Sequence, residues 1–286
     1  MDPVAATEPT PLPALPARLE QWVAFFADKD LPVLRQTAQA FEQLGHHRDD
    51  VDARTIADRV LEDPLMTLKV FAWSATMRSR RQTTELETIE PVILMTGIDP
   101  FFNHFSALPT VESALARHPR ALPGILRVVG RSFRASAYAR DWALRRRDLD
   151  TEVILIAALL HDFVEMLMWI YAPEAALRIQ ALQQGDRTLR SADLQRSVYG
   201  VELAELELAL ARQWHLPELL TTLLDDHHAA HPQTRNVLFA VNLARHSARG
   251  WDDAALHDDY EDIARLLNTT PGHVRELVIP PEHPCG

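Results

Sequence analysis

The stretch AALLHDFVEM, residues 157–166, places a histidine beside an aspartate within a strongly apolar segment of the chain. The whole apolar window, residues 153–172, is long enough to span a membrane, but His161, Asp162 and Glu165 lie near its centre. Ionisable groups at that depth are costly in lipid. We therefore interpret the window as a buried core helix and expect no membrane association.

The composition of the chain favours a helical protein with a substantial core. Its 286 residues, 47% of them hydrophobic, can bury such a core, and the low glycine content of nine residues favours helix. The net charge of -11 disfavours general binding of DNA or RNA, so we expect no nucleic-acid partner. Two basic runs, Arg78–Arg81 and Arg145–Arg147, are interpreted as solvated loops or helix ends.

The N-terminus and the cysteine content indicate a cytoplasmic protein. Residues 1–16 hold five prolines and are predicted to form a disordered leader. That segment lacks the basic start and apolar run of a secretory signal. The single cysteine, Cys285, allows neither a disulfide within the chain nor a thiolate metal cluster, which fits a reducing compartment.

Helical periodicity runs through almost all of the remaining chain, and no convincing strand alternation interrupts it. Pro64 ends one predicted helix and begins the next. A long helix is predicted from about Leu122 to Arg147, and the helix that carries the His-Asp doublet is predicted to run from near Thr151 to just before Pro173. The sequence therefore predicts an all-α fold of roughly a dozen or more helices.

The His-Asp doublet by itself allows two interpretations. A histidine and an aspartate adjacent on a helix point about 100° apart, so both reach one metal ion only where other helices add ligands. A second cluster, Asp225-Asp226-His227-His228, follows about 65 residues downstream and offers such ligands. The alternative, a hydrogen-bonded core histidine, is the commoner use of a lone His on an apolar helix.

The order of several motifs resembles the HDOD family, the HD-related output domain of bacterial signalling proteins. The motifs are LPVLRQTAQAF (31–41), IADRVLEDPLMTLKVFAWSA (56–75), ELETIEPVILMTGID (85–99), ALLHDF (158–163) and YGVELAELELALARQWHLPELLTTLLDDHH (199–228). The resemblance implies an HD-domain-like helical fold with an additional N-terminal helical subdomain. It places an HDOD domain at 17–250, with an N-terminal helical part at about 17–118 and an HD-like part at about 119–250, followed by a C-terminal helical extension at 251–286.

The resemblance also implies where a metal site would lie. Catalytic relatives in the HD superfamily bind metal through a histidine on an earlier helix, the His-Asp doublet and a later aspartate. Here Arg131 stands at the earlier histidine position, and a guanidinium offers no lone pair to a metal. The implied site positions are Arg131, His161, Asp162, Glu165, Leu203, His227, His228 and Asn242.

Of these positions, Leu203 and Asn242 also lack the expected ligand, and Glu165 is an anion where relatives carry a cation that suits phosphate. We therefore expect a degenerate site with no metal, no cofactor and no hydrolysis. We expect Arg131 to form an ion pair with Asp162 or Glu165. A rebuilt metal site of His161, Asp162, Glu165 and His227 is kept as an alternative.

The resemblance implies a non-catalytic signal-transduction module that acts through contacts with other signalling proteins. The alternatives are a metal-dependent phosphohydrolase acting on nucleotides or cyclic dinucleotides, and a receptor that binds such a ligand through Arg131 or Arg78–Arg81 without cleaving it. An aromatic stripe formed by Trp22, Phe25 and Phe26 would suit an interface, but we favour core packing for it.

Overall fold

The computed structural model describes residues 15–77, 85–186 and 189–279, and its secondary structure is helical throughout. Within these ranges strand-like pairing is limited to an isolated bridge between Val33 and Thr110. The predicted all-α fold is confirmed. The predicted leader up to residue 14, the basic run Arg78–Arg81 and Cys285 lie outside the described residues.

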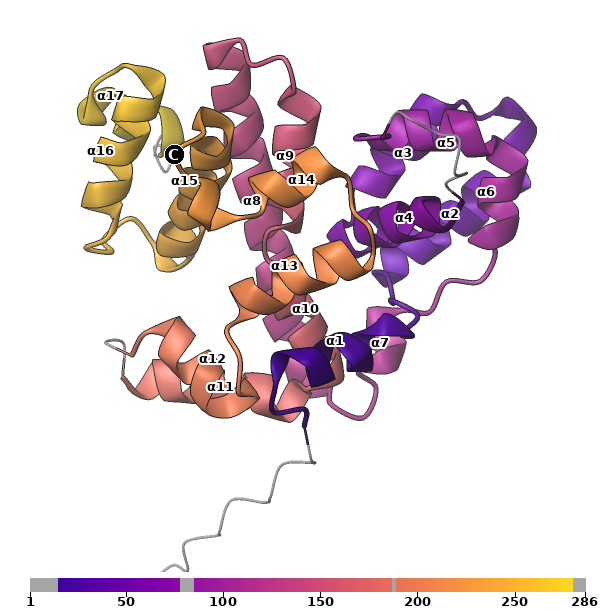
Figure 1. Cartoon of the computed structure of the whole chain (residues 1–286), viewed down its shortest axis with the longest axis horizontal. Coiled ribbons are helices and arrows are strands. Elements are labelled where there is room, and N and C mark those ends of the chain that lie inside the picture. The colour runs from indigo at the N-terminus through magenta and orange to yellow at the C-terminus, as the bar shows by residue number, and fades with distance from the viewer. Residues whose placement is uncertain (1–14, 78–84, 187–188, 280–286) are drawn as a thin grey trace, which may run out of the picture.

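The first part of the chain is made of short helices, most of which lie together at the right of Figure 1. In chain order the elements are α1 (Leu19–Ala27), α2 (Arg35–His46), η1 (Arg48–Asp50), α3 (Ala53–Leu61), α4 (Pro64–Met77), α5 (Ile89–Thr96), α6 (Ile98–His104) and α7 (Val111–Ala114). The predicted break before Pro64 is confirmed, because Asp63 precedes α4 and accepts a hydrogen bond from the Leu65 amide at 2.9 Å. Asp63 also accepts from the Leu34 amide at 2.7 Å and so joins the start of α2 to that of α4.

The second part of the chain is built around the long helix α8, which packs against α9 and α15. Its elements are η2 (Pro119–Ala121), α8 (Leu122–Arg146), α9 (Thr151–Leu160), α10 (Phe163–Tyr171), α11 (Pro173–Gly185), α12 (Ser191–Tyr199), α13 (Leu203–Gln213), α14 (Glu218–Leu223), η3 (Asp226–His228), α15 (Pro232–His246), η4 (Ser247–Arg249), α16 (Leu256–Leu267) and α17 (Pro271–Val278). Helix α16 packs on α15, and α17 packs on α16. The long helix predicted from about Leu122 is confirmed.

The helix predicted to carry the doublet is divided in two. Helix α9 ends at Leu160 and α10 begins at Phe163, so His161 and Asp162 form the turn between them. The stretch Thr151–Tyr171 is long and apolar enough to cross a membrane, yet 89% of its most apolar window is buried within the protein. The predicted burial is therefore confirmed, whereas the predicted continuity of the helix is not.

Helix α1 packs on α13, in the second part of the chain. It lies beside α13 in Figure 1, and the Trp22 indole donates a hydrogen bond to the Tyr199 carbonyl at 2.9 Å. The rings of Trp22 and Phe26 stack with centroids 5.7 Å apart, and both side chains are fully buried. The aromatic stripe is thus part of the core.

Two glycines of α8 provide a matched test of this packing. A Cβ at Gly124 would overlap the Trp169 indole on α10, whereas a Cβ at Gly130 would meet nothing within 4 Å. We expect Gly124→Ala to lower the free energy of unfolding by about 1–3 kcal/mol because it overpacks the core. Gly130→Ala should raise it by about 0.5–1 kcal/mol through helix propensity alone. Urea unfolding followed by circular dichroism measures both, and equal effects would contradict the close approach of α8 and α10.

Candidate functional site

The His-Asp doublet lies in the turn between α9 and α10, where it faces α8, α13, η3 and α15. His161 and Asp162 are both almost fully buried, with exposed fractions of 4% and 5%. A buried carboxylate is costly unless charged or hydrogen-bonding partners surround it. The partners of Asp162 therefore define the chemistry of the site.

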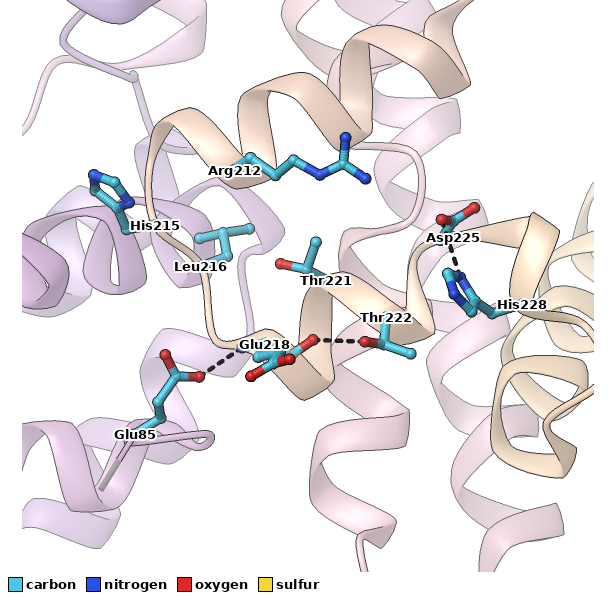
Figure 2. Close-up of a pocket in the computed structure, with 9 residues that line it drawn as sticks. All are labelled: Glu85, Arg212, His215, Leu216, Glu218, Thr221, Thr222, Asp225 and His228. Carbon is cyan, nitrogen blue, oxygen red and sulfur yellow. Dashed lines mark hydrogen bonds and ion pairs between the residues drawn. The ribbon is translucent and has the colours of Figure 1, made fainter. Parts of the chain in front are cut away.

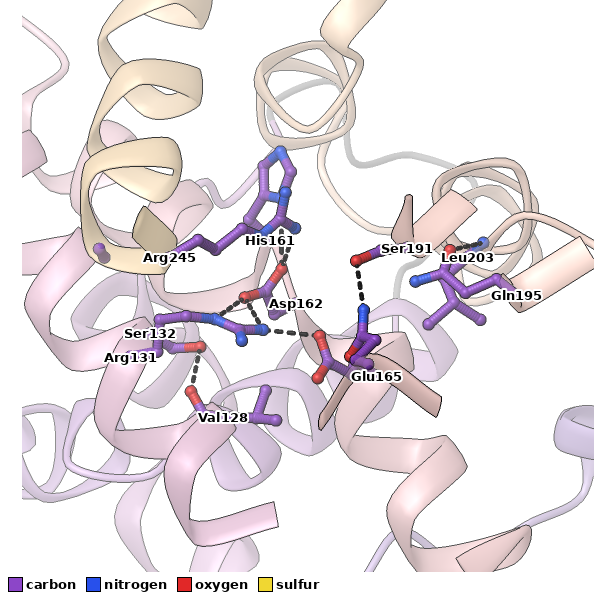
Figure 3. A network of polar contacts seen from close by, with 12 residues as sticks. Val128, Arg131, Ser132, His161, Asp162, Glu165, Ser191, Gln195, Leu203 and Arg245 are labelled. Atoms are coloured by element: carbon purple, nitrogen blue, oxygen red, sulfur yellow. Dashed lines mark hydrogen bonds and ion pairs between the residues drawn. The ribbon is translucent and has the colours of Figure 1, made fainter. Parts of the chain in front are cut away.

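Arg131 of α8 supplies the first partner, as Figure 3 shows. Its Nε and Nη2 atoms donate to Asp162 Oδ2 at 2.8 and 2.6 Å, and Nη2 also donates to Glu165 Oε2 at 2.6 Å. The predicted ion pair of Arg131 with Asp162 or Glu165 is thus confirmed, with both carboxylates engaged. Arg131 lies where the resemblance expects a metal-binding histidine, and its positive charge neutralises the doublet from that side.

Arg245, near the end of α15, is a second partner that the sequence analysis did not identify. Its Nη2 atom donates to Asp162 Oδ1, the oxygen that Arg131 leaves free. Both oxygens of Asp162 are therefore bound by guanidinium groups. Burial by itself would raise the pKa of Asp162, but Arg131, Arg245 and His161 together hold it well below its ordinary value.

The cluster Asp225-Asp226-His227-His228 contacts the doublet through Asp226 and not through its histidines. His161 Nε2 lies 3.1 Å from Asp226 Oδ1. His227 and His228 instead contact Asp225, each through Nδ1 at 3.0 Å, and their side chains are 89% and 60% exposed. In the 3-10 turn η3, neighbouring residues point in different directions, and this separates the two aspartates.

Two other predicted site positions, Leu203 and Asn242, form no side-chain hydrogen bond or ion pair with the doublet or its arginines within the described residues. Leu203 begins α13, and its amide donates to Gln195 Oε1 at 3.3 Å, across from Glu165 in Figure 3. Asn242 is half-buried on α15, and within the described residues its side chain makes no hydrogen bond. Arg245, three residues further along the helix, reaches the doublet instead.

Glu207 of α13 is a second residue that the sequence did not reveal. It is 5% exposed, and burial raises its pKa well above the ordinary value. Burial favours the neutral ring of His161, whereas an ionised Glu207 and the contacts with Asp162 and Asp226 raise the pKa of His161; the effect of Asp162 and Asp226 remains when Glu207 is neutral. His161 Nδ1 and Glu207 Oε1 are both buried without a hydrogen-bond partner.

These protonation states give a balanced group of charges. Protonated His161 joins Arg131 and Arg245 as three cations, and they face the three carboxylates of Asp162, Glu165 and Asp226. A fourth ionised carboxylate, at Glu207, would be buried without a matching cation. We therefore assign the neutral acid form to Glu207.

The donor set of this network does not fit a metal ion. Two guanidinium groups bind both oxygens of Asp162, and a cation would have to displace them against their positive charge. Throughout the described ranges, no three His, Cys, Asp or Glu side chains are grouped as metal ligands. The alternative set of His161, Asp162, Glu165 and His227 is not brought together, because His227 turns outward to Asp225.

Asp162→Asn tests the central contact of the network. The amide cannot neutralise two guanidinium groups, so we expect the free energy of unfolding to fall by about 3–5 kcal/mol. Asp141→Asn is the matched control, since Asp141 pairs with Arg145 on the exposed face of α8, where the side chains are 49% and 44% exposed. That change should cost less than about 1 kcal/mol. Similar losses in the two variants, measured by urea unfolding, would show that the network is not a stabilising centre.

Glu207→Gln tests the charge assignment through the pH dependence of stability. The pKa of Glu207 is raised in the folded state. Its contribution to the free energy of unfolding is therefore full below the ordinary glutamate pKa of 4.5 and is lost as the pH rises. Glutamine mimics the neutral acid without this loss. We expect the variant to become more stable relative to the wild type as the pH rises above 4.5, by up to about 1.4 kcal/mol per pH unit.

Thermal and urea unfolding across that pH range give the comparison, with the exposed Glu205→Gln as the control that should follow the wild type. If Glu207→Gln is less stable than the wild type at every pH, Glu207 is ionised and paired with His161, and the charge assignment is wrong.

Comparison with known proteins agrees with this fold. An HDOD domain model matches residues 31–230. The MmoQ response regulator of Methylococcus capsulatus str. Bath is similar in structure, with a TM-score of 0.63 and 16% identity over 89% of this chain and 100% of that chain. A virulence factor from Campylobacter jejuni subsp. jejuni gives a TM-score of 0.60 and 15% identity over 92% and 93% of the two chains. The search of curated proteins found no match.

At these identities the two solved structures support the fold alone. The family model, by contrast, covers well over half of the chain and includes the doublet, Glu207 and η3. Its span begins within the N-terminal helices and ends just before α15, so Arg245 lies beyond it. On this match, the chain belongs to the HDOD family.

Proposed function

We propose that this HDOD protein is a non-catalytic signal-transduction module that acts in the cytoplasm through contacts with other proteins. One observation carries the proposal: Arg131 and Arg245 bind both oxygens of Asp162, the doublet residue that the resemblance assigns to a metal. Metal-dependent hydrolysis requires a water activated by a complete set of ligands. Arginines in place of that ion leave no group to activate the water.

A signalling role rests on family membership and on fold-level analogy. The HDOD family is the HD-related output domain, and the structurally similar MmoQ is described as a response regulator. Both descriptions fit a chain whose doublet serves to hold helices together. The net charge of -11 argues that the partner is not a nucleic acid.

Two alternatives have specific observations against them. A phosphohydrolase acting on nucleotides or cyclic dinucleotides would need the arginines to leave the doublet. A receptor that binds a nucleotide through Arg131 would have to take its guanidinium from two carboxylates at 2.6 Å, and Glu165 would repel the incoming phosphate.

Metal analysis with an activity assay tests the non-catalytic proposal. We expect protein purified without a histidine tag to contain no stoichiometric Fe, Mn or Zn. We also expect no hydrolysis of cyclic dinucleotides or nucleotides in the presence of those ions. Asp162→Asn is the control for contaminating enzymes, since any activity that it retains does not come from this site. Metal-dependent activity in the wild type that Asp162→Asn abolishes would overturn the proposal.

Partner capture tests the contact role. We expect a pull-down from the organism that encodes the chain to yield a protein that also binds the purified chain in calorimetry. Calorimetry with cyclic dinucleotides separates this role from that of a receptor. Binding of such a ligand without any protein partner would favour the receptor.

A further inference from the structure

One face of the long helix α8 is exposed to solvent along the whole length of the helix. Most of its exposed positions recur at spacings of three and four residues and so form one stripe: Pro123, Leu126, Arg127, Gly130, Arg134, Ala137, Asp141, Leu144 and Arg145. At a rise of about 1.5 Å per residue, the 25 residues of α8 extend for about 37 Å. A surface of this length and of one helix's width has the shape that a second helix would match.

One edge of this α8 face is apolar. Leu126 and Leu144 are 45% and 57% exposed, and Leu149, just after the helix, is 97% exposed. The exposed positions between the two helical leucines include the small residues Gly130 and Ala137, and a Cβ at Gly130 would meet nothing within 4 Å. Exposed leucines with open space between them would receive the apolar side chains of a helix that lies along α8.

The other edge of the α8 face is basic. Helix α8 carries six arginines and a single acidic residue, Asp141, although the net charge of the whole chain is -11. Arg127 makes no ion pair or hydrogen bond within the described residues, and Arg134 donates to the uncharged Ala244 carbonyl at 3.1 Å. Asp141 is already paired with Arg145. The charges of Arg127 and Arg134 are therefore available to an acidic partner.

The exposed arginine of the pocket in Figure 2 is placed differently. Arg212 lines that pocket together with Glu218 and Asp225, so the chain itself supplies carboxylates beside the charge. Arg127 and Arg134 have no ion pair with any carboxylate of the described residues. Their neutralisation would have to come from another molecule.

The combination of leucines and arginines selects the class of partner. A nucleic acid would neutralise the arginines but would leave the leucines against phosphates, and the net charge of -11 would oppose its binding. The same net charge would oppose an anionic membrane surface. A helix of another protein that carries apolar residues along one side, with Asp or Glu beside them, matches both edges of the face.

We propose that the exposed face of α8 docks an acidic amphipathic helix of a partner protein, with apolar side chains against Leu126 and Leu144 and carboxylates on Arg127 and Arg134. The inference rests on the proposed contact role and names the surface that performs it. Arg131 of the same helix binds Asp162, so the partner would be held by the helix that also carries the first cation of the doublet.

Calorimetry with two synthetic amphipathic helices of equal length tests this face. Both peptides carry the same leucine stripe, but one has glutamates beside it and the other has lysines. We expect the glutamate peptide to bind, and the lysine peptide to bind at least about 10-fold more weakly. Arg127→Glu should weaken binding of the glutamate peptide by about 5-fold or more, because it replaces attraction with repulsion. Leu144→Glu should weaken it by about 10-fold or more, because it also removes apolar contact.

Arg178→Glu and Leu182→Glu are the matched controls, because both residues are exposed and belong to α11 instead of α8. They make the same changes of charge and polarity and should bind the glutamate peptide like the wild type. Circular dichroism checks that all four variants are folded.

Several results would each overturn the proposal. The glutamate peptide does not bind at millimolar concentration, the lysine peptide binds as tightly, or the α11 variants weaken binding as much as the α8 variants. Binding of duplex DNA or of phosphatidylglycerol vesicles in preference to the glutamate peptide would assign the face to those surfaces instead. A protein partner recovered by capture that binds Arg127→Glu and Leu144→Glu as tightly as the wild type would leave the contact role intact and overturn the α8 face alone.

Discussion

The carboxylate of Asp162 is the constraint on which the arrangement of the second part of the chain depends. Its side chain is 4% exposed and must be matched by positive charge from outside its own turn. Arg131 on α8 and Arg245 on α15 supply that charge to separate oxygens. Because each oxygen accepts from a different helix, the carboxylate fixes how α8 and α15 stand relative to the turn between α9 and α10.

Guanidinium groups differ from a metal ion in what they make possible at such a position. A catalytic metal keeps a coordination position for water, whereas an arginine only donates hydrogen bonds and stays protonated. The arginines also belong to the chain, so the buried carboxylate stays neutralised whatever ions the solution contains. The two arginines thus link α8 and α15 to the doublet by themselves.

The sequence predicted one contact of this network, the ion pair of Arg131 with Asp162 or Glu165. Arg131 stands where the resemblance implies a metal ligand, and its positive charge indicated a carboxylate, Asp162 or Glu165, as its partner. The sequence did not indicate Arg245, because the resemblance implies a metal ligand on α15, at Asn242, and an arginine cannot be one. The contact of Asp226 with His161, in place of one from His227, could not be predicted because the sequence does not show which way each residue of a short 3-10 turn points. Glu207 was missed because α13 carries several glutamates, of which Glu205 is exposed and Glu207 buried.

The position of α1 has a consequence for how the chain folds. Trp22 of α1 is hydrogen-bonded to Tyr199, which is 177 residues away in sequence. During synthesis, α1 therefore emerges long before α12 and α13, the helices that bury its aromatic rings. Contacts of such separation slow folding and leave apolar surface exposed in the meantime. A truncation that ends before α13 would therefore leave α1 without the helix against which it packs.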